Sequence, residues 1–392
     1  MGNRAVVKFG GADLSSGERI REAAEMVIKS GYKEIVVVVS AIGKTTDSLV
    51  ETMSQIGVSD SDYAEIVSMG ERTSARFFCS ALRSLGAEAV YFDPAHGNWP
   101  IITDSNFRDA KPNLEKTKAL IKKHLEPLLG KAIPVVCGFL GRDEHGKITT
   151  LGRGGSDTTA LLIANCLEAD EVILVKDTNG VLSADPKIVP NARMFDELDI
   201  HEMFALAQGG AKILRPEALR YKLPNQKLRV VSFYSNNLST GGTDITGVFY
   251  PKSAEISQHE GLSAVTVVCT INPENLSKLF STLRQDSIYG VSTGRKSVTV
   301  FARLTNVKDT VNRLHSLKLF KAISCKDKVG MIELTHPVFI DSSGWVAKIT
   351  NTLASKGINI IEVTTSKATI NLFIEESSLK DALKAVGEAF ET

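Results

Sequence analysis

The chain has 392 residues, more than one hydrophobic core usually organises, so we expect two or three domains. Hydrophobic residues make up 43% and charged residues 23%, a balance that excludes a disordered or membrane-embedded chain. The net charge of +1 and the pI near 7.6 give no overall attraction to nucleic acid or to anionic lipid, so we expect neither nucleic acid nor a membrane as a partner.

Short apolar strands alternate with helical segments over the first two thirds of the chain. The predicted strands are 5–9, 34–39, 89–92, 133–139, 171–175 and 228–232. The predicted helices are one that buries Ile20, Ala24, Val27 and Ile28 and stops at Gly31, then 62–85, 113–129, 157–166 and a helix-rich stretch at 199–221. Near-continuous Val and Ile strands between helices are typical of a parallel sheet covered on both faces. We therefore predict an α/β domain over residues 1–252, with an open, mainly parallel sheet and helices on both faces.

Beyond residue 252, one β-α-β-β-α pattern occurs twice. Its first copy has segments 263–271, 275–284, 287–292, 297–304 and 308–317, and its second has 329–335, 344–356, 358–364, 368–373 and 379–390. We predict two ferredoxin-like βαββαβ-type domains, at 261–327 and 328–392, that pack together because each is small. The second copy lacks the fourth strand that its sheet needs. We expect this strand to come from 320–325 or from a second subunit.

The cysteines and the N-terminus bear on the location of the protein. The five cysteines are scattered and form no C-x-x-C pair, which indicates buried thiols in a reducing compartment. We find no basic segment followed by an apolar run at the N-terminus, and the longest apolar run, 35–39, is too short to cross a bilayer. These features predict a cytoplasmic protein.

Glycine-bearing turns follow several of the predicted strands, at the edge where open α/β sheets bind ligands. Lys8-Phe9-Gly10-Gly11 offers backbone N–H groups and a lysine to an anion, although a glycine pair after a strand is also an ordinary turn. It matches neither G-x-G-x-x-G nor G-x-x-x-x-G-K-[ST]. The next turn, 40–47, carries small hydroxyl residues that suit a polar substrate. Alternatively, Thr46 or Asp47 merely caps the following helix.

The segment 152–159 is the most specific of these turns. Three glycines, Arg153 and several hydroxyl residues precede an apolar helix, whose free N–H groups and positive end favour an anion. Asp157 could instead cap this helix, but a cap requires neither three glycines nor an arginine, so we favour a binding site. Two further turns, 176–187 and 209–214, carry Lys176 and Lys212 and by themselves resemble ordinary loops.

Taken in order, these segments resemble the aspartokinases of the amino-acid kinase family over nearly the whole chain. The matching segments are 7–11, 39–41 with 46–47, 70–71, 138–139, 151–160, Asp177, Gly180, 184–186, 210–212 and 242–243. The two C-terminal copies resemble ACT domains, small amino-acid-sensing modules, and 343–347 with 357–360 match the ACT signature.

The resemblance implies transfer of the ATP γ-phosphoryl group to the side-chain carboxylate of L-aspartate, giving 4-phospho-L-aspartate, the first step toward lysine, threonine and methionine. This carboxylate is already ionised at neutral pH, so no general base is needed, and catalysis rests on positioning and on charge neutralisation. ATP and Mg²⁺ are the implied cofactors, with Mg²⁺ carried by the phosphates of ATP and no dedicated metal site on the protein.

The same resemblance implies roles for individual residues. The implied catalytic residues are Lys8, Asp157 and Lys212, with Asp157 orienting the lysines. Substrate binding is assigned to Ser40, Thr46, Glu71, Arg153, Gly154 and Ser156, with Arg153 on a substrate carboxylate and Glu71 on the α-ammonium. ATP binding is assigned to Lys8, Gly10, Gly11, Lys176, Asp177, Leu182, Asp185, Lys187 and Lys212.

The ACT resemblance implies regulation by an end-product amino acid and a homodimer or larger homo-oligomer formed through the ACT domains. Only the second copy has a glycine in the loop after its first strand, so we expect the effector there. The residues assigned to it are Asp341, Ser343, Gly344, Val346, Asn359 and Ile360. Alternatively, both copies serve only as a dimer interface.

Six positions depart from the common family pattern. Ala12-Asp13 replace Thr-Ser, Leu182 replaces Tyr, and Lys187 replaces Arg. Thr178 replaces Val, and Arg215 replaces His. The loss of an aromatic surface and of a planar guanidinium changes the expected purine and phosphate contacts.

Three other functions compete with this interpretation. An acetylglutamate or uridylate kinase of the same fold would share the glycine-rich turns but would not be expected to carry Gly70-Glu71 together with tandem ACT copies. An ACT-regulated dehydrogenase requires G-x-G-x-x-G after a strand, which we do not find. The presence of Lys8, Asp157 and Lys212 argues against a catalytically dead amino-acid sensor.

Overall fold

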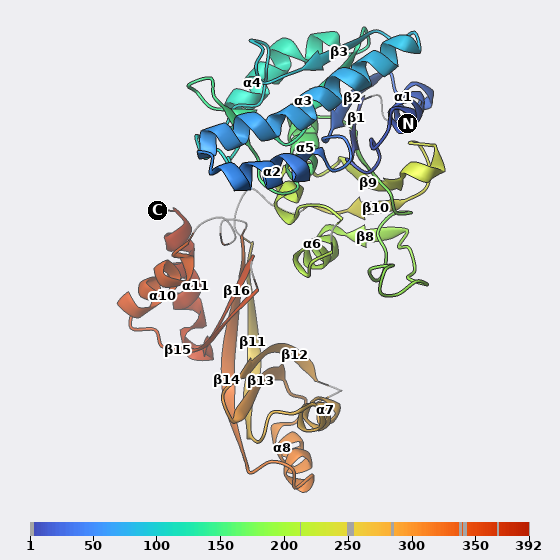
Figure 1. The fold of residues 1–392 in the computed structure, drawn as a ribbon. Coiled ribbons are helices and arrows are strands. Elements are labelled where there is room, and N and C mark those ends of the chain that lie inside the picture. The colour runs from blue at the N-terminus through green and yellow to red at the C-terminus, as the bar shows by residue number, and fades with distance from the viewer. Residues whose placement is uncertain are drawn as a thin grey trace. The chain divides into compact units, whose positions relative to one another are not determined.

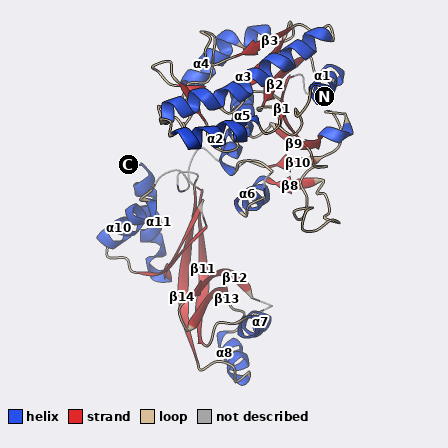
Figure 2. Ribbon diagram, viewed as in Figure 1, coloured by secondary structure: helices blue, strands red, loops and turns tan. Residues whose placement is uncertain are grey.

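The computed structural model describes residues 4–211, 213–248, 255–283, 286–336, 339, 343–366 and 368–391. They belong to two compact units, residues 1–249 and 250–392 (Figure 1). The first unit mixes helices with a central sheet, and the second combines one long sheet with a few helices (Figure 2).

An eight-stranded sheet forms the centre of the first unit. Its strand order is β3 (Ala89–Phe92), β4 (Ile133–Cys137), β2 (Glu34–Val39), β1 (Arg4–Phe9), β7 (Glu171–Lys176), β9 (Lys227–Ser232), β10 (Thr243–Thr246) and β8 (Glu197–Asp199). All neighbours from β3 to β9 are parallel, whereas β10 runs antiparallel to β9. The central strands β1 and β2 each bury five of their six residues, as their Val-rich sequences predict. The predicted open, mainly parallel sheet is confirmed.

Helices pack around this sheet. They are α1 (Gly17–Lys29), α2 (Thr45–Ile56), α3 (Asp60–Ser84), α4 (Leu114–His124), α5 (Gly155–Leu167) and α6 (Ile200–Gln208), with short 3-10 turns η1 (Glu126–Leu128), η2 (Pro216–Tyr221) and η3 (Phe233–Ser235). α1 packs on α3 and α4 on α5. α5 buries twelve of its thirteen residues; its polar first turn lies at the candidate site, and 160–167 are apolar except for Asn165.

Two predicted helical details were wrong. Ile28 does not lie on the buried face of α1 but is 43% exposed. The predicted helix 113–129 ends as α4 at His124 and continues only as η1. The helix-rich stretch 199–221 contains α6 and η2, with a break after α6 where Gly210 has a φ of 103°. A small hairpin of β5 (Leu140–Arg142) and β6 (Ile148–Thr150), not predicted from sequence, follows β4.

The second unit contains one six-stranded antiparallel sheet. Its strand order is β12 (Ser287–Thr293), β13 (Ser297–Arg303), β11 (Glu255–Val268), β14 (Ala322–Thr335), β16 (Thr369–Glu375) and β15 (Ile360–Ser366). Among its described residues, the helices of this unit are α7 (Pro273–Thr282), α8 (Val307–Ser316), α10 (Trp345–Ser355) and α11 (Leu379–Glu391), with η4 (Glu376–Ser378) before the last. Both copies thus have the predicted order of elements, but they share a sheet.

The two copies share β11 and β14. The start of β11 supplies the fourth strand that the second copy lacks. The start of β11 pairs with the end of β14, from Glu255 opposite Thr335 to His259 opposite Met331. The expectation that 320–325 supplies this strand was wrong, because 322–325 pair with 265–268 and complete the first copy instead. A register shift near Gly261 in β11, and Lys328 with a φ of 56° in β14, mark where each strand passes from one copy to the other.

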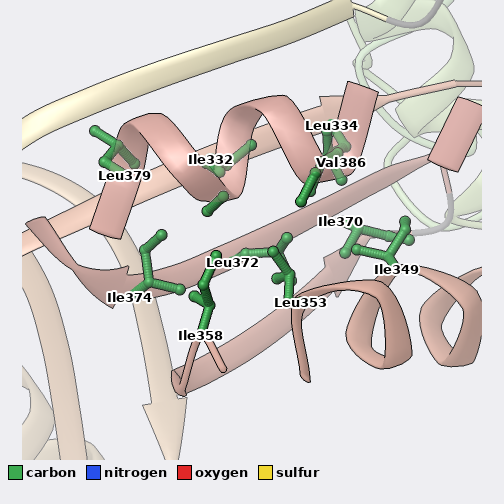
Figure 3. Close-up of a cluster of buried hydrophobic side chains, with 12 residues drawn as sticks. Ile332, Leu334, Ile349, Leu353, Ile358, Ile370, Leu372, Ile374, Leu379 and Val386 are labelled. Carbon is green, nitrogen blue, oxygen red and sulfur yellow. The ribbon is translucent and has the colours of Figure 1, made fainter. Parts of the chain in front are cut away.

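Buried side chains hold the two copies together. In the second copy, aliphatic residues from β14, β16, α10 and α11 form a continuous core, of which Ile332, Leu353, Leu372 and Val386 are central members (Figure 3). Between the copies, the rings of Phe301 and Phe373 stack with centroids 3.8 Å apart. The two copies therefore share one six-stranded sheet and pack together through buried side chains, as predicted.

No helix among the described residues is long and apolar enough to span a membrane. All five cysteines are free; four are buried and Cys325 is half-buried.

Candidate active site

The candidate site lies where the parallel strands β1, β2, β4 and β7 end. Lys8 belongs to β1, and Lys176 is the last residue of the neighbouring strand β7. Asp157 enters from the first turn of α5. Its Oδ1 lies 2.8 Å from Lys8 Nζ, and its Oδ2 lies 3.4 Å from Lys176 Nζ. One buried carboxylate therefore holds two lysines from adjacent strands.

Asp157 does not cap α5, which excludes the alternative weighed from sequence. The N-cap is Gly154, with a φ of 74° and no side-chain hydrogen bond. Burial alone would raise the pKa of Asp157, but the ammonium groups of Lys176 and Lys8 outweigh it and hold this pKa below its usual value. Burial lowers the pKa of Lys176 to about 8, against the opposing effect of Asp157. Two ammonium groups and one carboxylate leave this cluster a formal charge of +1.

The glycine turn after β1 is closed by Asp13, a residue not assigned to the site from sequence. The Gly10 N–H donates to Asp13 Oδ2 at 2.9 Å, and the Asp13 N–H donates to the Gly10 carbonyl at 3.1 Å. The N–H of Gly10, assigned to a phosphate from sequence, is thus held by a carboxylate here. Asp13 is 1% exposed, and burial raises its pKa to about 6 although Lys8 and Lys176 oppose this. A charged residue two positions after the glycine pair was the signal available in the sequence.

Gly11 lies where the turns after β1 and β2 meet. A Cβ on Gly11 would stand 2.7 Å from the Ala41 carbonyl oxygen and 3.0 Å from that of Gly43. The Ser40 N–H also donates to the Phe9 carbonyl at 3.1 Å. Only glycine permits this approach, which places the hydroxyl-bearing turn of Ser40 beside the lysine cluster.

Glu71 lies beside the turn after β2. This residue of α3 is 3% exposed; its Oε1 accepts from the Ala41 N–H at 3.2 Å, and its Oε2 has no hydrogen-bond partner among the described residues. Burial raises its pKa to about 8. A Cβ on the preceding Gly70 would stand 2.7 Å from Ala41 Cβ and 3.6 Å from Thr46 Oγ1. Glu71 and Thr46, both assigned to substrate from sequence, therefore flank one turn.

Thr46 and Asp47 do not cap α2, because the helix begins at Thr45 and its N-cap is Lys44, without a side-chain hydrogen bond. Ser156 lies against the end of β4. A Cβ on Gly138 would stand 2.7 Å from Ser156 Oγ and 2.9 Å from the Val39 carbonyl oxygen. The next residue, Phe139, has a φ of 68°, a conformation that costs a residue with a side chain about 1–3 kcal/mol. The turn after β4 thus combines a close backbone approach at Gly138 with a left-handed Phe139.

Other assigned residues lie in exposed loops. Arg153 and Gly154 are exposed before α5, and Asp177, Asp185 and Lys187 are exposed after β7. Leu182 is half-buried and forms a bridge with Met194. The Thr243 hydroxyl anchors this loop: it accepts from the Val181 N–H at 2.9 Å and donates to the Phe195 carbonyl at 2.6 Å. Lys212 lies outside the described residues.

The residues assigned to an effector lie in the second unit. Gly344 has a φ of 92° and is the N-cap of α10, so the loop needs glycine there. Ser343, Val346 and Asn359 are exposed, and Ile360 is half-buried. Asp341 lies outside the described residues.

Comparisons with known proteins identify the family. The amino acid kinase family matches residues 3–232, and an ACT domain matches residues 339–390. Over 98% of this chain, the sequence is 31% identical to the aspartokinases of Mycolicibacterium smegmatis and Corynebacterium glutamicum, covering 95% and 96% of those proteins. The chain belongs to the aspartokinase family. The predicted resemblance is confirmed, the enzyme class is that of a phosphotransferase, and the dehydrogenase alternative is set aside.

Solved structures show the same fold. The aspartate kinase from Synechocystis matches with a TM-score of 0.72 and 27% identity, over 99% of this chain and 70% of that one. Aspartokinase III of E. coli, in complex with aspartate and ADP, matches with a TM-score of 0.57 and 20% identity, over 99% and 100% of the two chains. The chain thus shares the fold of aspartate kinase structures, and its ACT match lies at residues 339–390.

Proposed function

We propose that this chain transfers the γ-phosphoryl group of ATP to the side-chain carboxylate of L-aspartate. The product is 4-phospho-L-aspartate, at the start of the lysine, threonine and methionine pathway. The observation that carries this proposal is the buried Asp157, which holds Lys8 and Lys176 at the ends of two adjacent strands. The aspartokinase relatives and a family structure with aspartate and ADP bound support the substrates.

Lys8 is proposed to neutralise the charge that develops on the transferring phosphoryl group, together with Lys212. Asp157 orients Lys8 and does not accept a proton, because its pKa is held low by the two ammonium groups. An ionised aspartate side chain attacks without a general base. The barrier is lowered by placing positive charge in a buried site and by aligning the reactants.

The substrate is proposed to lie at the turns after β2 and β4. Glu71 pairs with the α-ammonium group, and its partnerless Oε2 and raised pKa mark a buried carboxylate that lacks a cation. Arg153, exposed beside the start of α5, takes the α-carboxylate with two hydrogen bonds. Ser40, Thr46, Gly154 and Ser156 supply the smaller contacts.

ATP is proposed to lie along the turn after β1 and the loop after β7, in contact with Gly10, Gly11, Lys176, Asp177, Leu182, Asp185 and Lys187. Mg²⁺ accompanies the phosphates and offsets their charge. Among the described residues, no group of three or more His, Cys, Asp and Glu side chains is arranged to hold a metal. A cation shared with phosphates fits these residues through Asp13, whose Oδ1 is buried and has no partner in the part of the chain that the structure describes.

We further propose that an amino-acid effector binds the second ACT copy at Ser343, Gly344, Val346, Asn359 and Ile360, together with Asp341, and that the chain forms homodimers or larger assemblies through the second unit. The left-handed Gly344 at the start of α10 supports this choice of copy. The free cysteines support a reducing, cytoplasmic setting. Lysine, threonine and methionine, added separately to the activity assay, test the sensor. Inhibition by none of the three would contradict it.

Acyl phosphate trapping tests the proposed reaction. The enzyme is incubated with ATP, Mg²⁺ and hydroxylamine, and with aspartate, glutamate or acetylglutamate as acceptor. We expect a hydroxamate from aspartate alone. A hydroxamate only from glutamate or acetylglutamate would overturn the substrate assignment.

A further inference from the structure

Asp13 is a buried carboxylate beside the proposed phosphate site, and no step of the proposed reaction uses it. Its side chain is 1% exposed. Oδ2 accepts from the Gly10 N–H, but Oδ1 is buried and has no hydrogen-bond partner among the described residues. Closing the Gly10 turn needs only one of the two oxygens. The turn therefore accounts for the burial of Oδ2 but not for the burial of Oδ1.

The second oxygen of Asp13 has no hydrogen-bond partner among the described residues. A buried carboxylate oxygen without a donor is costly, and native structures contain few such groups. The nearby lysines do not supply a donor, since Lys8 and Lys176 both face Asp157. Within the described part of the chain, Oδ1 is therefore open to a ligand.

The position of Asp13 decides the chemistry of that ligand. Asp13 Oδ2 and Lys8 Nζ lie 3.1 and 3.7 Å from the point where a Cβ on Gly10 would stand, so carboxylate and lysine face the same side of the turn. A phosphate at this turn would be drawn to Lys8 and repelled by Asp13. Asp177 adds a second negative charge that acts on Asp13. A cation between phosphate and carboxylate removes this repulsion.

We propose that Asp13 Oδ1 binds the divalent cation that accompanies ATP, and so couples nucleotide binding to the metal. Mg²⁺ is usually held by one or two carboxylates together with substrate phosphates, which matches a single buried carboxylate at a phosphate turn. The inference rests on the proposed use of ATP. It assigns to the protein one ligand of an ion otherwise carried by the nucleotide.

ADP affinity measured with and without metal tests this assignment. Calorimetric titrations with ADP are run in Mg²⁺ and in EDTA, on the wild type, on Asp13→Asn and on Glu18→Gln as control. Glu18 is an exposed carboxylate in the first turn of α1. Asp13→Asn keeps an oxygen for the Gly10 N–H while removing the charge. Asp13→Ser is the second variant, should Asp13→Asn fail to fold.

We expect Mg²⁺ to strengthen ADP binding to the wild type and to Glu18→Gln, and we expect this gain to fall by roughly tenfold in Asp13→Asn. Metal-free ADP should bind the variant more tightly than the wild type, while Mg²⁺–ADP should bind it no better. The electron paramagnetic resonance spectrum of Mn²⁺–ADP, a readout independent of activity, should change between wild type and variant.

Two results would overturn the inference alone. Equal tightening of ADP binding in Mg²⁺ and in EDTA would mean that Asp13 only competes with phosphate for the Gly10 N–H. Unchanged affinities in both conditions, with an unchanged Mn²⁺ spectrum, would mean that Asp13 only closes the turn. A wild type that binds ADP in neither condition would overturn the proposed function as well.

Discussion

The two sheets of this protein use their strands in different ways. In the first unit, neighbouring parallel strands have their carboxyl ends on the same side of the sheet. Lys8 and Lys176, far apart in sequence, therefore come together on Asp157. In the second unit all neighbouring strands are antiparallel, so their carboxyl ends alternate between the two sides. There the pairing brings apolar rings together in the interior, as Phe301 and Phe373 show. The parallel sheet of the first unit therefore gathers charged side chains at the carboxyl ends of its strands. The antiparallel sheet of the second unit instead joins two copies through buried apolar side chains.

The largest expected effect follows from removing a charge at the carboxyl ends of the parallel strands. Lys8→Ala should lower kcat by roughly 10²–10³-fold, because the lost charge matters most in the transition state. Asp157 keeps Lys176 as a partner, so the fold should persist. Steady-state kinetics in ATP and aspartate measure this effect, and circular dichroism checks the fold.

The control for Lys8→Ala is Lys29→Ala, which removes an exposed lysine of α1 paired with Glu25 and should leave kcat unchanged. A Lys8→Ala enzyme with normal kcat and a raised KM for ATP would contradict the role given to Lys8. The charge of Lys8 would then serve only to bind ATP.

A substitution in the antiparallel core should affect stability instead. Phe373→Ala should lower the free energy of unfolding of the second unit by about 3–5 kcal/mol, because it removes a fully buried ring. Hydrogen exchange in β11 and β14 should accelerate, while exchange in β1 and β2 should not. These rates are measured on the full chain by mass spectrometry.

Val291→Thr is the control for Phe373→Ala. Val291 lies on the edge strand β12 and is 38% exposed, so this change should cost no more than about 0.5 kcal/mol. Equal acceleration of exchange in both sheets after Phe373→Ala would contradict the separation of roles between the two units.

The smallest expected effect is a pH dependence of kcat/KM for aspartate. In the proposed function, Glu71 pairs with the substrate ammonium only when ionised, and burial raises its pKa to about 8. The kcat/KM for aspartate should therefore rise roughly tenfold per pH unit below 8 and level off above it. Glu71→Gln should lower kcat/KM and flatten this profile. An unchanged slope in the variant would show that another group titrates.

Periodicity in the sequence was sufficient to predict most elements of the fold. The predicted strands 34–39 and 89–92 agree with β2 and β3 at both ends, because runs of Val and aromatic residues in a buried sheet have few alternatives. The boundary placed at 327/328 falls inside β14 instead. The polar pair Asp327-Lys328 resembles a linker, yet it lies where β14 passes between the copies and Lys328 adopts a positive φ. A local pattern cannot distinguish such a point from a loop, because only the pairing with β11 defines it.

The residues of the candidate site were partly predictable from the sequence, but the ion pairs between them were not. The sequence indicated Lys8 and Asp157, and the structure brings these two together. It did not indicate that Lys176 shares Asp157, because that depends on the neighbouring positions of β1 and β7 in the sheet. Asp13 was noticed only as a departure from the family pattern, since its burial and its partnerless oxygen are visible only in three dimensions.

The central claim is that a substrate carboxylate, placed before Lys8 and Asp157, attacks ATP directly. L-aspartate labelled with ¹⁸O in its side-chain carboxylate tests this, with hydroxylamine present to cleave the acyl phosphate at carbon. We predict that the phosphate released carries one ¹⁸O atom from aspartate, measured by mass spectrometry. Unlabelled phosphate would mean that water attacked ATP, and would contradict the account.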